Sequence, residues 1–136
     1  MTALLLAFCL GIVSGLRTFT PLAAVFIRRG SVWGIVLAIA AVAEYVLDVL
    51  PNTPSRTGPV GLTFRVISGA LGGWLIAAMH GGAGIAGAFA GIIGAVLGTY
   101  AGHAARIAAI KRIVAYPAAI AEDLVAIGLA ALIVTR

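Results

Sequence analysis

Long apolar stretches, separated by short polar connections, make up almost the whole chain. Each stretch is close to the roughly 20 residues that an α-helix needs to cross the hydrocarbon core of a bilayer. This spacing predicts an all-α integral membrane protein with about five transmembrane helices, forming a single domain over residues 1–136. The five stretches run over about 3–27, 32–50, 62–79, 83–105 and 113–135.

The first stretch is interrupted near its middle by the segment Gly15-Leu16-Arg17-Thr18-Phe19-Thr20-Pro21. Pro21 removes one helical hydrogen bond and disfavours helical dihedrals at the residue before it, so we expect a kink or an opening here. The permanent charge of Arg17 costs about 2.5 to 3.5 kcal/mol near the bilayer centre on insertion scales. We therefore expect Arg17 to face the protein interior and to bind an anion, with the hydroxyls of Thr18 and Thr20 beside it.

All four acidic residues of the chain lie inside apolar stretches. Glu44 and Asp48 are four apart in the second stretch, so they share one helix face, and Glu122 and Asp123 are adjacent in the fifth. The first two stretches are joined by a short loop, which makes Glu44 the expected partner of Arg17. Asp48 lies one turn along the same face, and Glu122 is the alternative partner.

The fourth stretch carries a glycine at every third or fourth position. Such a ladder lies on one face of a helix and lets a neighbouring backbone approach closely, which favours helix packing over a pore lining. The chain has more glycine faces than one internal contact needs, so we also expect a homo-oligomer. The ladder consists of Gly84, Gly87, Gly91, Gly94, Gly98 and Gly102.

Three short matches, in the same order, relate the two halves of the chain. Residues 11–15 match 94–98, residues 27–29 match 110–112, and residues 40–44 match 118–122. They predict a repeat A over about 3–50 and a repeat B over about 83–135, which flank a linker and central helix over about 51–80. One intervening span would invert the second copy, as in many transporters. Tyr100 then takes the position of Arg17, so the copies differ at their polar centre.

The composition supports a membrane location. Only 10% of the residues are charged and 62% are hydrophobic, whereas a soluble domain has about 25% charged residues. The net charge of +5 comes from basic residues at the ends of the apolar stretches, which indicates contact with membrane lipids and not with nucleic acid. We expect a multi-pass protein of the inner (cytoplasmic) membrane.

The basic residues also predict an orientation. In the five-helix topology the two termini lie on opposite sides, and five of the nine basic residues share the N-terminal side. The positive-inside rule then predicts a cytoplasmic N-terminus. These five are Arg56, Arg65, Arg106, Lys111 and Arg112.

Motifs for catalysis or metal binding are absent from the sequence. It has no glycine-rich phosphate loop, and its one cysteine and two histidines lack metal-ligand spacing. No arrangement of serine, histidine and aspartate resembles a nucleophile motif. We therefore predict no catalytic residue, no metal site and no cofactor.

A set of polar and small residues runs through nearly the whole chain in a specific order. It comprises Gly15-Leu16-Arg17, Pro21, Ala43-Glu44, Asp48, Pro51, Pro54, Arg56, Arg65, Gly69-Ala70 and Ala121-Glu122-Asp123. In this pattern the chain resembles an uncharacterised family of small prokaryotic integral membrane proteins, described as a domain of unknown function. The resemblance implies a multi-helix membrane fold and brings no established activity, cofactor or catalytic residue.

Three functions remain open at this point. The first is a small transporter or channel for a small solute or ion, with a midplane site that draws on Arg17, Thr18, Thr20, Glu44, Asp48, Tyr100, Glu122 and Asp123. The second is a non-transporting scaffold or assembly protein in which the charges only hold the helices together. The third is a lipid-phosphate enzyme or flippase, in which Arg56 and Arg65 would bind the headgroup because guanidinium groups bind phosphate in a bidentate way.

Overall fold

The computed structural model describes residues 2–49, 57–111 and 115–136, and the regular secondary structure in these ranges is entirely helical. Residues 59–79, 84–110 and 117–134 form three helices that are long and apolar enough to cross a membrane. The prediction of an all-α protein is confirmed, and these three helices indicate a membrane protein. The elements are α1 (Ala3–Leu16), α2 (Thr20–Arg28), α3 (Val32–Val49), α4 (Pro59–Met79), α5 (Gly84–Ile110) and α6 (Ala115–Val134).

The outer surface is rich in large apolar side chains. Ile85 is 74% exposed, Leu124 66%, Phe89 64% and Trp33 61%. Extended apolar surface of this kind marks contact with lipid or with another protein, because it is unfavourable in water. The exposed side chains are thus what lipid-facing helices require.

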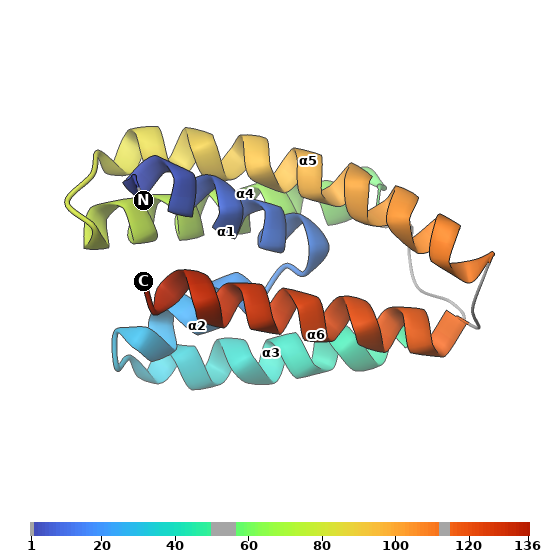
Figure 1. Cartoon of the computed structure of the whole chain (residues 1–136). Coiled ribbons are helices and arrows are strands. Elements are labelled where there is room, and N and C mark those ends of the chain that lie inside the picture. The colour runs from blue at the N-terminus through green and yellow to red at the C-terminus, as the bar shows by residue number, and fades with distance from the viewer. Residues whose placement is uncertain (1, 50–56, 112–114) are drawn as a thin grey trace.

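The helices are arranged in two layers (Figure 1). Helices α1, α4 and α5 form one layer, and α2, α3 and α6 form the other. Leu6, Leu10 and Val13 of α1 are completely or almost completely buried, together with Ile76 of α4 and Ala126 of α6. Helix α1 therefore lies at the centre of the core and holds the two layers together.

The first apolar stretch forms a helical hairpin. Helix α1 ends at Leu16, Arg17 is extended (φ −142°, ψ 123°), and α2 begins at Thr20 with Pro21 in its first turn. Proline suits this position because its fixed φ is helical and it has no N–H to leave unsatisfied. The chain reverses at the break, so that α2 runs back towards the end of the bundle where α1 begins (Figure 1).

The helix opens at the predicted break, but the reversal overturns the prediction that residues 3–27 form one span with the two termini on opposite sides. Arg28, at the end of α2, donates a hydrogen bond from Nε to the carbonyl oxygen of Val134 at 3.2 Å. Ala3 lies against Gly82, in the connection between α4 and α5. Both termini, the end of α2 and the α4–α5 connection thus share one end of the bundle, which we call the terminal end (Figure 1).

The predicted inversion of the two repeats does not hold for their first helices. Helices α1 and α5 run side by side in the same direction, because Gly94 lies against Phe8 and Gly98 lies against Ile12. An inverted repeat requires these two helices to run in opposite directions. Helices α3 and α6 do run in opposite directions, as the inverted repeat requires (Figure 1). The departure from the predicted inversion therefore lies in the first stretch, where the chain forms a hairpin instead of one span.

The prediction of a cytoplasmic N-terminus from the basic residues also loses its basis. The N-terminus lies at the terminal end, away from Arg65, Arg106 and Lys111. Arg65 is only 6% exposed, and Arg106 forms ion pairs inside the bundle, so neither behaves as a basic residue of a membrane flank. Arg56 and Arg112 lie outside the described residues.

The glycine ladder of α5 serves two neighbouring helices at once. A Cβ atom added at Gly91 would collide with the carbonyl oxygen of Gly69 in α4, and one added at Gly94 would collide with that of Phe8 in α1. The other ladder glycines, Gly84, Gly87, Gly98 and Gly102, also contact helices of the same chain. The ladder therefore packs the bundle internally, and the surplus of glycine faces that favoured an oligomer does not exist for α5.

We predict that Gly91→Leu destabilises the protein, because the new side chain has no space between α5 and α4. The expected loss is at least the roughly 1–3 kcal/mol typical of overpacking, since the obstacle is a backbone and not a movable side chain. Gly128→Leu on α6 is the control, because nothing lies within 4 Å of a Cβ added there. Thermal unfolding in detergent measures both. Equal midpoints for the two variants would contradict the packing described for the ladder.

The hairpin makes a second prediction, which concerns accessibility from the two sides of the membrane. In a protein whose Cys9 has been replaced by alanine, single cysteines at positions 2 and 136 should react with a membrane-impermeant reagent from the same side. A cysteine at position 57 should react from the other side, because α4 begins at the opposite end of the bundle. Labelling of positions 2 and 136 from different sides would restore the kinked span.

Candidate charged site

Arg17, at the tip of the hairpin, is the largest fully buried side chain in the described part of the protein. Its Nη1 atom lies 2.7 Å from Oδ2 of Asp48, and its Nη2 atom pairs with Oδ1 of Asp123. The guanidinium carbon is 5.2 Å from the centroid of the Tyr45 ring, within the range of a cation–π contact. Arg17 thus connects the hairpin to both α3 and α6.

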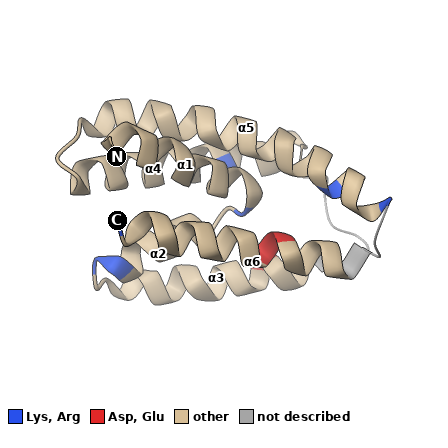
Figure 2. Ribbon diagram, viewed as in Figure 1, with Lys and Arg blue, Asp and Glu red and all other residues tan. Residues whose placement is uncertain are grey.

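A second arginine completes the cluster from α5. Nη1 of Arg106 lies 2.9 Å from the same Asp48 oxygen and 3.9 Å from Oε2 of Glu122. We call Arg17, Asp48, Arg106, Glu122 and Asp123 the charged cluster. In Figure 2 its acidic part on α6 stands out within an otherwise uncharged stretch of that helix.

Arg106 lies in the bundle and not at the membrane flank that we predict from its place near the end of an apolar stretch. The sequence contains a signal for this inward position. Arg106 follows Gly98 and Gly102 at steps of four and therefore lies on the ladder face of α5, which packs against the rest of the bundle.

The expected ion pair between Glu44 and Arg17 does not form. Its two carboxylate oxygens accept hydrogen bonds from the backbone N–H groups of Thr18, at 2.9 Å, and Phe19, at 3.1 Å. These two N–H groups lie in the break between α1 and α2, and a negative charge just before the start of a helix is favoured by the helix dipole. The carboxylate of Glu44 therefore stabilises the start of α2, while Asp48 and Asp123 neutralise Arg17.

The two threonines of the break attach the hairpin to its neighbours. The backbone carbonyl of Thr18 accepts a hydrogen bond from Oγ of Ser68 on α4 at 2.5 Å, and Oγ1 of Thr20 lies 2.5 Å from the hydroxyl of Tyr45. Neither Ser68 nor Tyr45 was predicted as a site residue. For Tyr45 a signal existed, because it is three residues before Asp48 and so shares its helix face.

Two other predicted site residues lie away from the cluster. Tyr100 is 53% exposed on the outer surface of α5, because that helix continues without a break at the position aligned with Arg17. Arg65 is buried in α4, and its carbonyl accepts a hydrogen bond from Ser14 of α1 at 2.9 Å. This burial removes Arg65 from a surface where it could hold a lipid headgroup, and Arg56 lies outside the described residues.

Two cavities reach the helix ends that flank the break, one at Leu16 and the other at Thr20. The first, the α5–α6 cavity, has a volume of about 290 Å³ and is lined by nine residues, among them Arg106 and Glu122. It extends from Ala109 and Ala118, near the connected ends of α5 and α6, to Leu16 at the end of α1. This cavity reaches two members of the charged cluster.

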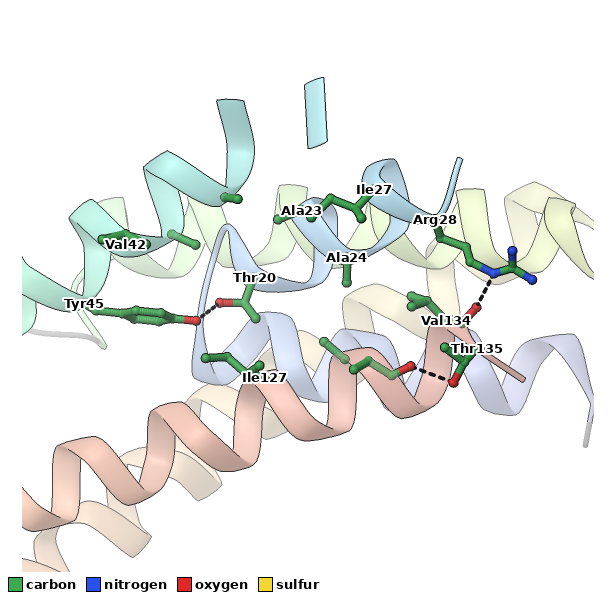
Figure 3. A pocket seen from close by; sticks show the side chains of 14 residues that line it. Thr20, Ala23, Ala24, Ile27, Arg28, Val42, Tyr45, Ile127, Val134 and Thr135 are labelled. Atoms are coloured by element: carbon green, nitrogen blue, oxygen red, sulfur yellow. Dashed lines mark hydrogen bonds between the residues drawn. The ribbon is translucent and has the colours of Figure 1, made fainter. Parts of the chain in front are cut away.

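The second cavity is an apolar groove between α2, α3 and α6, with a volume of about 430 Å³ (Figure 3). Arg28 and Thr135 lie at its outer end, and Thr20 and Tyr45 lie at its inner end. Thr20 and Tyr45 are hydrogen-bonded to each other at this inner end, and Arg17 is not among the residues that line this α2–α3–α6 groove.

Within the residues that the structure describes, no three histidine, cysteine or acidic side chains are grouped so as to hold a metal ion. No family model, curated protein or solved structure matches this chain. The resemblance to an uncharacterised membrane-protein family therefore stays a prediction based on the residues named above.

The ion pair between Arg17 and Asp123 makes a quantitative prediction. Arg17→Ala leaves buried carboxylates without their cation and should lower the free energy of unfolding by about 3–5 kcal/mol. Adding Asp123→Ala should recover a substantial part of this loss, because the same variant then lacks the stranded carboxylate. Adding Glu44→Ala to Arg17→Ala should not recover the lost stability, because Glu44 binds the backbone of residues 18 and 19.

Reversible unfolding in mixed micelles measures the variants as two double-mutant cycles. The cycle for Arg17 and Asp123 should show a coupling of about 1–3 kcal/mol, and the cycle for Arg17 and Glu44 should be close to additive. A strong coupling to Glu44 alone would contradict the arrangement described here.

Proposed function

We propose that the protein is a small membrane transporter or channel in which the charged cluster controls the passage of a small ion or charged solute. The observation that carries this proposal is the α5–α6 cavity, because Arg106 and Glu122 form part of its wall. The remaining lining residues are glycine, alanine, leucine and valine, so a charged solute that entered would find its polar contacts on these two side chains.

The proposed topology has four crossing helices, α3 to α6, and a hairpin that enters from the terminal end. At 1.5 Å per residue, α1 is about 21 Å long and α2 about 14 Å long, so each is too short to cross a hydrocarbon core of about 30 Å. A helix broken inside the membrane is a recurring feature of transporter sites, because it supplies backbone groups at that depth. Arg17 lies at this break.

The passage we propose runs from the α5–α6 cavity towards the tip of the hairpin. The contact between Arg106 and Glu122 is 3.9 Å, longer than a direct hydrogen bond, whereas Arg17 and Asp48 are 2.7 Å apart. In the proposed passage an entering ion meets this longer contact first, because Arg106 and Glu122 are the charged residues of the cavity wall. Leu16 closes the inner end of the cavity, and movement of the hairpin would open the way past it.

One observation favours a second function, that of a non-transporting scaffold. Arg17 is completely buried and forms close ion pairs with two carboxylates, and the cluster joins the hairpin to three other helices. A buried and paired charge of this kind can serve to specify how helices pack. In this alternative the cluster would hold the bundle together, and the cavity beside it would have no role.

Flux measurements on purified protein in vesicles distinguish the two functions. Protons, K⁺ and Cl⁻ serve as probes, with empty vesicles as the reference. We expect Ala105→Trp, which fills the α5–α6 cavity, to reduce the flux to near that of empty vesicles. Glu122→Gln should lower it as well, because the mutation removes the cavity's carboxylate charge.

Ala104→Trp is the matched control, since Ala104 is exposed, adjacent in sequence and not part of the cavity wall. It should retain the wild-type flux. If the wild-type protein carried none of the three ions, or if both tryptophan variants carried them equally, the scaffold would be the better account.

A further inference from the structure

The α2–α3–α6 groove has dimensions that suit an extended hydrocarbon chain. Along α2 it runs from Thr20 to Arg28, and along α6 from Ile127 to Thr135. Eight residues at 1.5 Å each give a length of about 12 Å, which is comparable to the roughly 15 Å depth of one leaflet of the hydrocarbon core. Its direction, parallel to the helices, is also that of an acyl chain in a bilayer.

The lining of the groove consists mainly of small and apolar side chains. Its volume is about 430 Å³, and its polar residues lie at its two ends, Thr20 and Tyr45 at one and Arg28 and Thr135 at the other. Six of the lining residues are alanines, three of them at 23, 24 and 38, and their small side chains leave the groove open along its length. An acyl chain fits this space.

The outer end of the groove carries a fixed positive charge. Nε of Arg28 donates to the carbonyl oxygen of Val134, which holds the guanidinium group against the end of α6 (Figure 3). Its two terminal nitrogens make no hydrogen bond within the described parts of the chain, and Arg28 is exposed. The hydroxyl of Thr135 lies beside the same opening. A guanidinium group in this setting binds a phosphate group well, and it favours an anionic headgroup because no ammonium group there offsets the negative charge.

We propose that the α2–α3–α6 groove is a binding site for an anionic phospholipid of the leaflet at the terminal end. One acyl chain lies along the alanines and ends near Tyr45 and Ile127. The phosphate of the headgroup binds the terminal nitrogens of Arg28. This site does not depend on the proposed transport function, because no member of the charged cluster lines the groove.

The test uses the purified full-length protein in vesicles of phosphatidylethanolamine that contain a photoactivatable lipid. The probe is phosphatidylglycerol with the photoreactive group near the end of one acyl chain, and the same label on phosphatidylcholine gives the zwitterionic comparison. Mass spectrometry identifies the labelled peptides. We expect labelling to concentrate on the residues around Tyr45 and Ile127, with an excess of about fivefold for the anionic lipid, the effect expected of one arginine at a membrane surface.

Two pairs of variants separate the headgroup from the acyl chain. Arg28→Gln should remove the excess for the anionic lipid, whereas Arg29→Gln should keep it, because Arg29 does not line the groove. If Arg28 served only to hold the end of α6, its loss would lower the labelling by both lipids equally. Ala38→Phe, which fills the groove, should reduce labelling by both lipids, and Ala43→Phe, which places the same side chain on an exposed part of α3, should not.

Four results would overturn the proposal, and three of them come from the labelling itself. These three are labelling spread evenly over the exposed helix faces, equal labelling by the anionic and zwitterionic lipids in the wild type, and equal effects of Ala38→Phe and Ala43→Phe. Crosslinks through the groove between two copies of the protein would identify a different occupant and would also overturn it. The Arg28 variant leaves the groove unfilled, so its result stands even if Ala38→Phe impairs folding.

Discussion

The structure depends on neutralising one permanent charge inside an apolar bundle. Arg17 cannot lose its proton and cannot reach water, so it needs carboxylates within contact distance. Asp48 and Asp123 provide them from α3 and α6. The two ion pairs hold these helices against the tip of the hairpin. The charge thus helps to bring the second layer of the fold onto the first.

The break that exposes Arg17 creates a second requirement. The N–H groups of Thr18 and Phe19 have no partner within a helix, and Glu44 accepts hydrogen bonds from both. The four acidic side chains of the chain therefore divide into one that stabilises the backbone of the break and three that face arginines. Elsewhere, close backbone contacts at glycines hold α1, α4 and α5 together, because an apolar surface gains little from helix association in lipid.

The two cavities beside the hairpin differ in chemistry, and this difference separates their proposed uses. The α5–α6 cavity contains both signs of charge, which suits a small charged solute. The α2–α3–α6 groove is apolar along its length and basic at its opening, which suits a lipid. Tyr45 contacts both the groove and the charged cluster, since its hydroxyl is hydrogen-bonded to Thr20 at the inner end of the groove and its ring lies against the guanidinium group of Arg17.

The sequence by itself determined the features that depend on neighbours along the chain or on solvation. It predicted the apolar helices, the break at residues 15–21, the burial of Arg17 and the packing role of the glycine ladder. Tertiary structure decided that the break reverses the chain and that Asp48 and Asp123, not Glu44, pair with Arg17. It also decided that Arg106 joins this cluster and that Tyr100 faces outwards. The physical reason is that these outcomes depend on the rotation and direction of whole helices. Glu44 is 26 residues from Thr18, and only the packing of α2 against α3 brings its carboxylate to the freed N–H groups rather than to the guanidinium group.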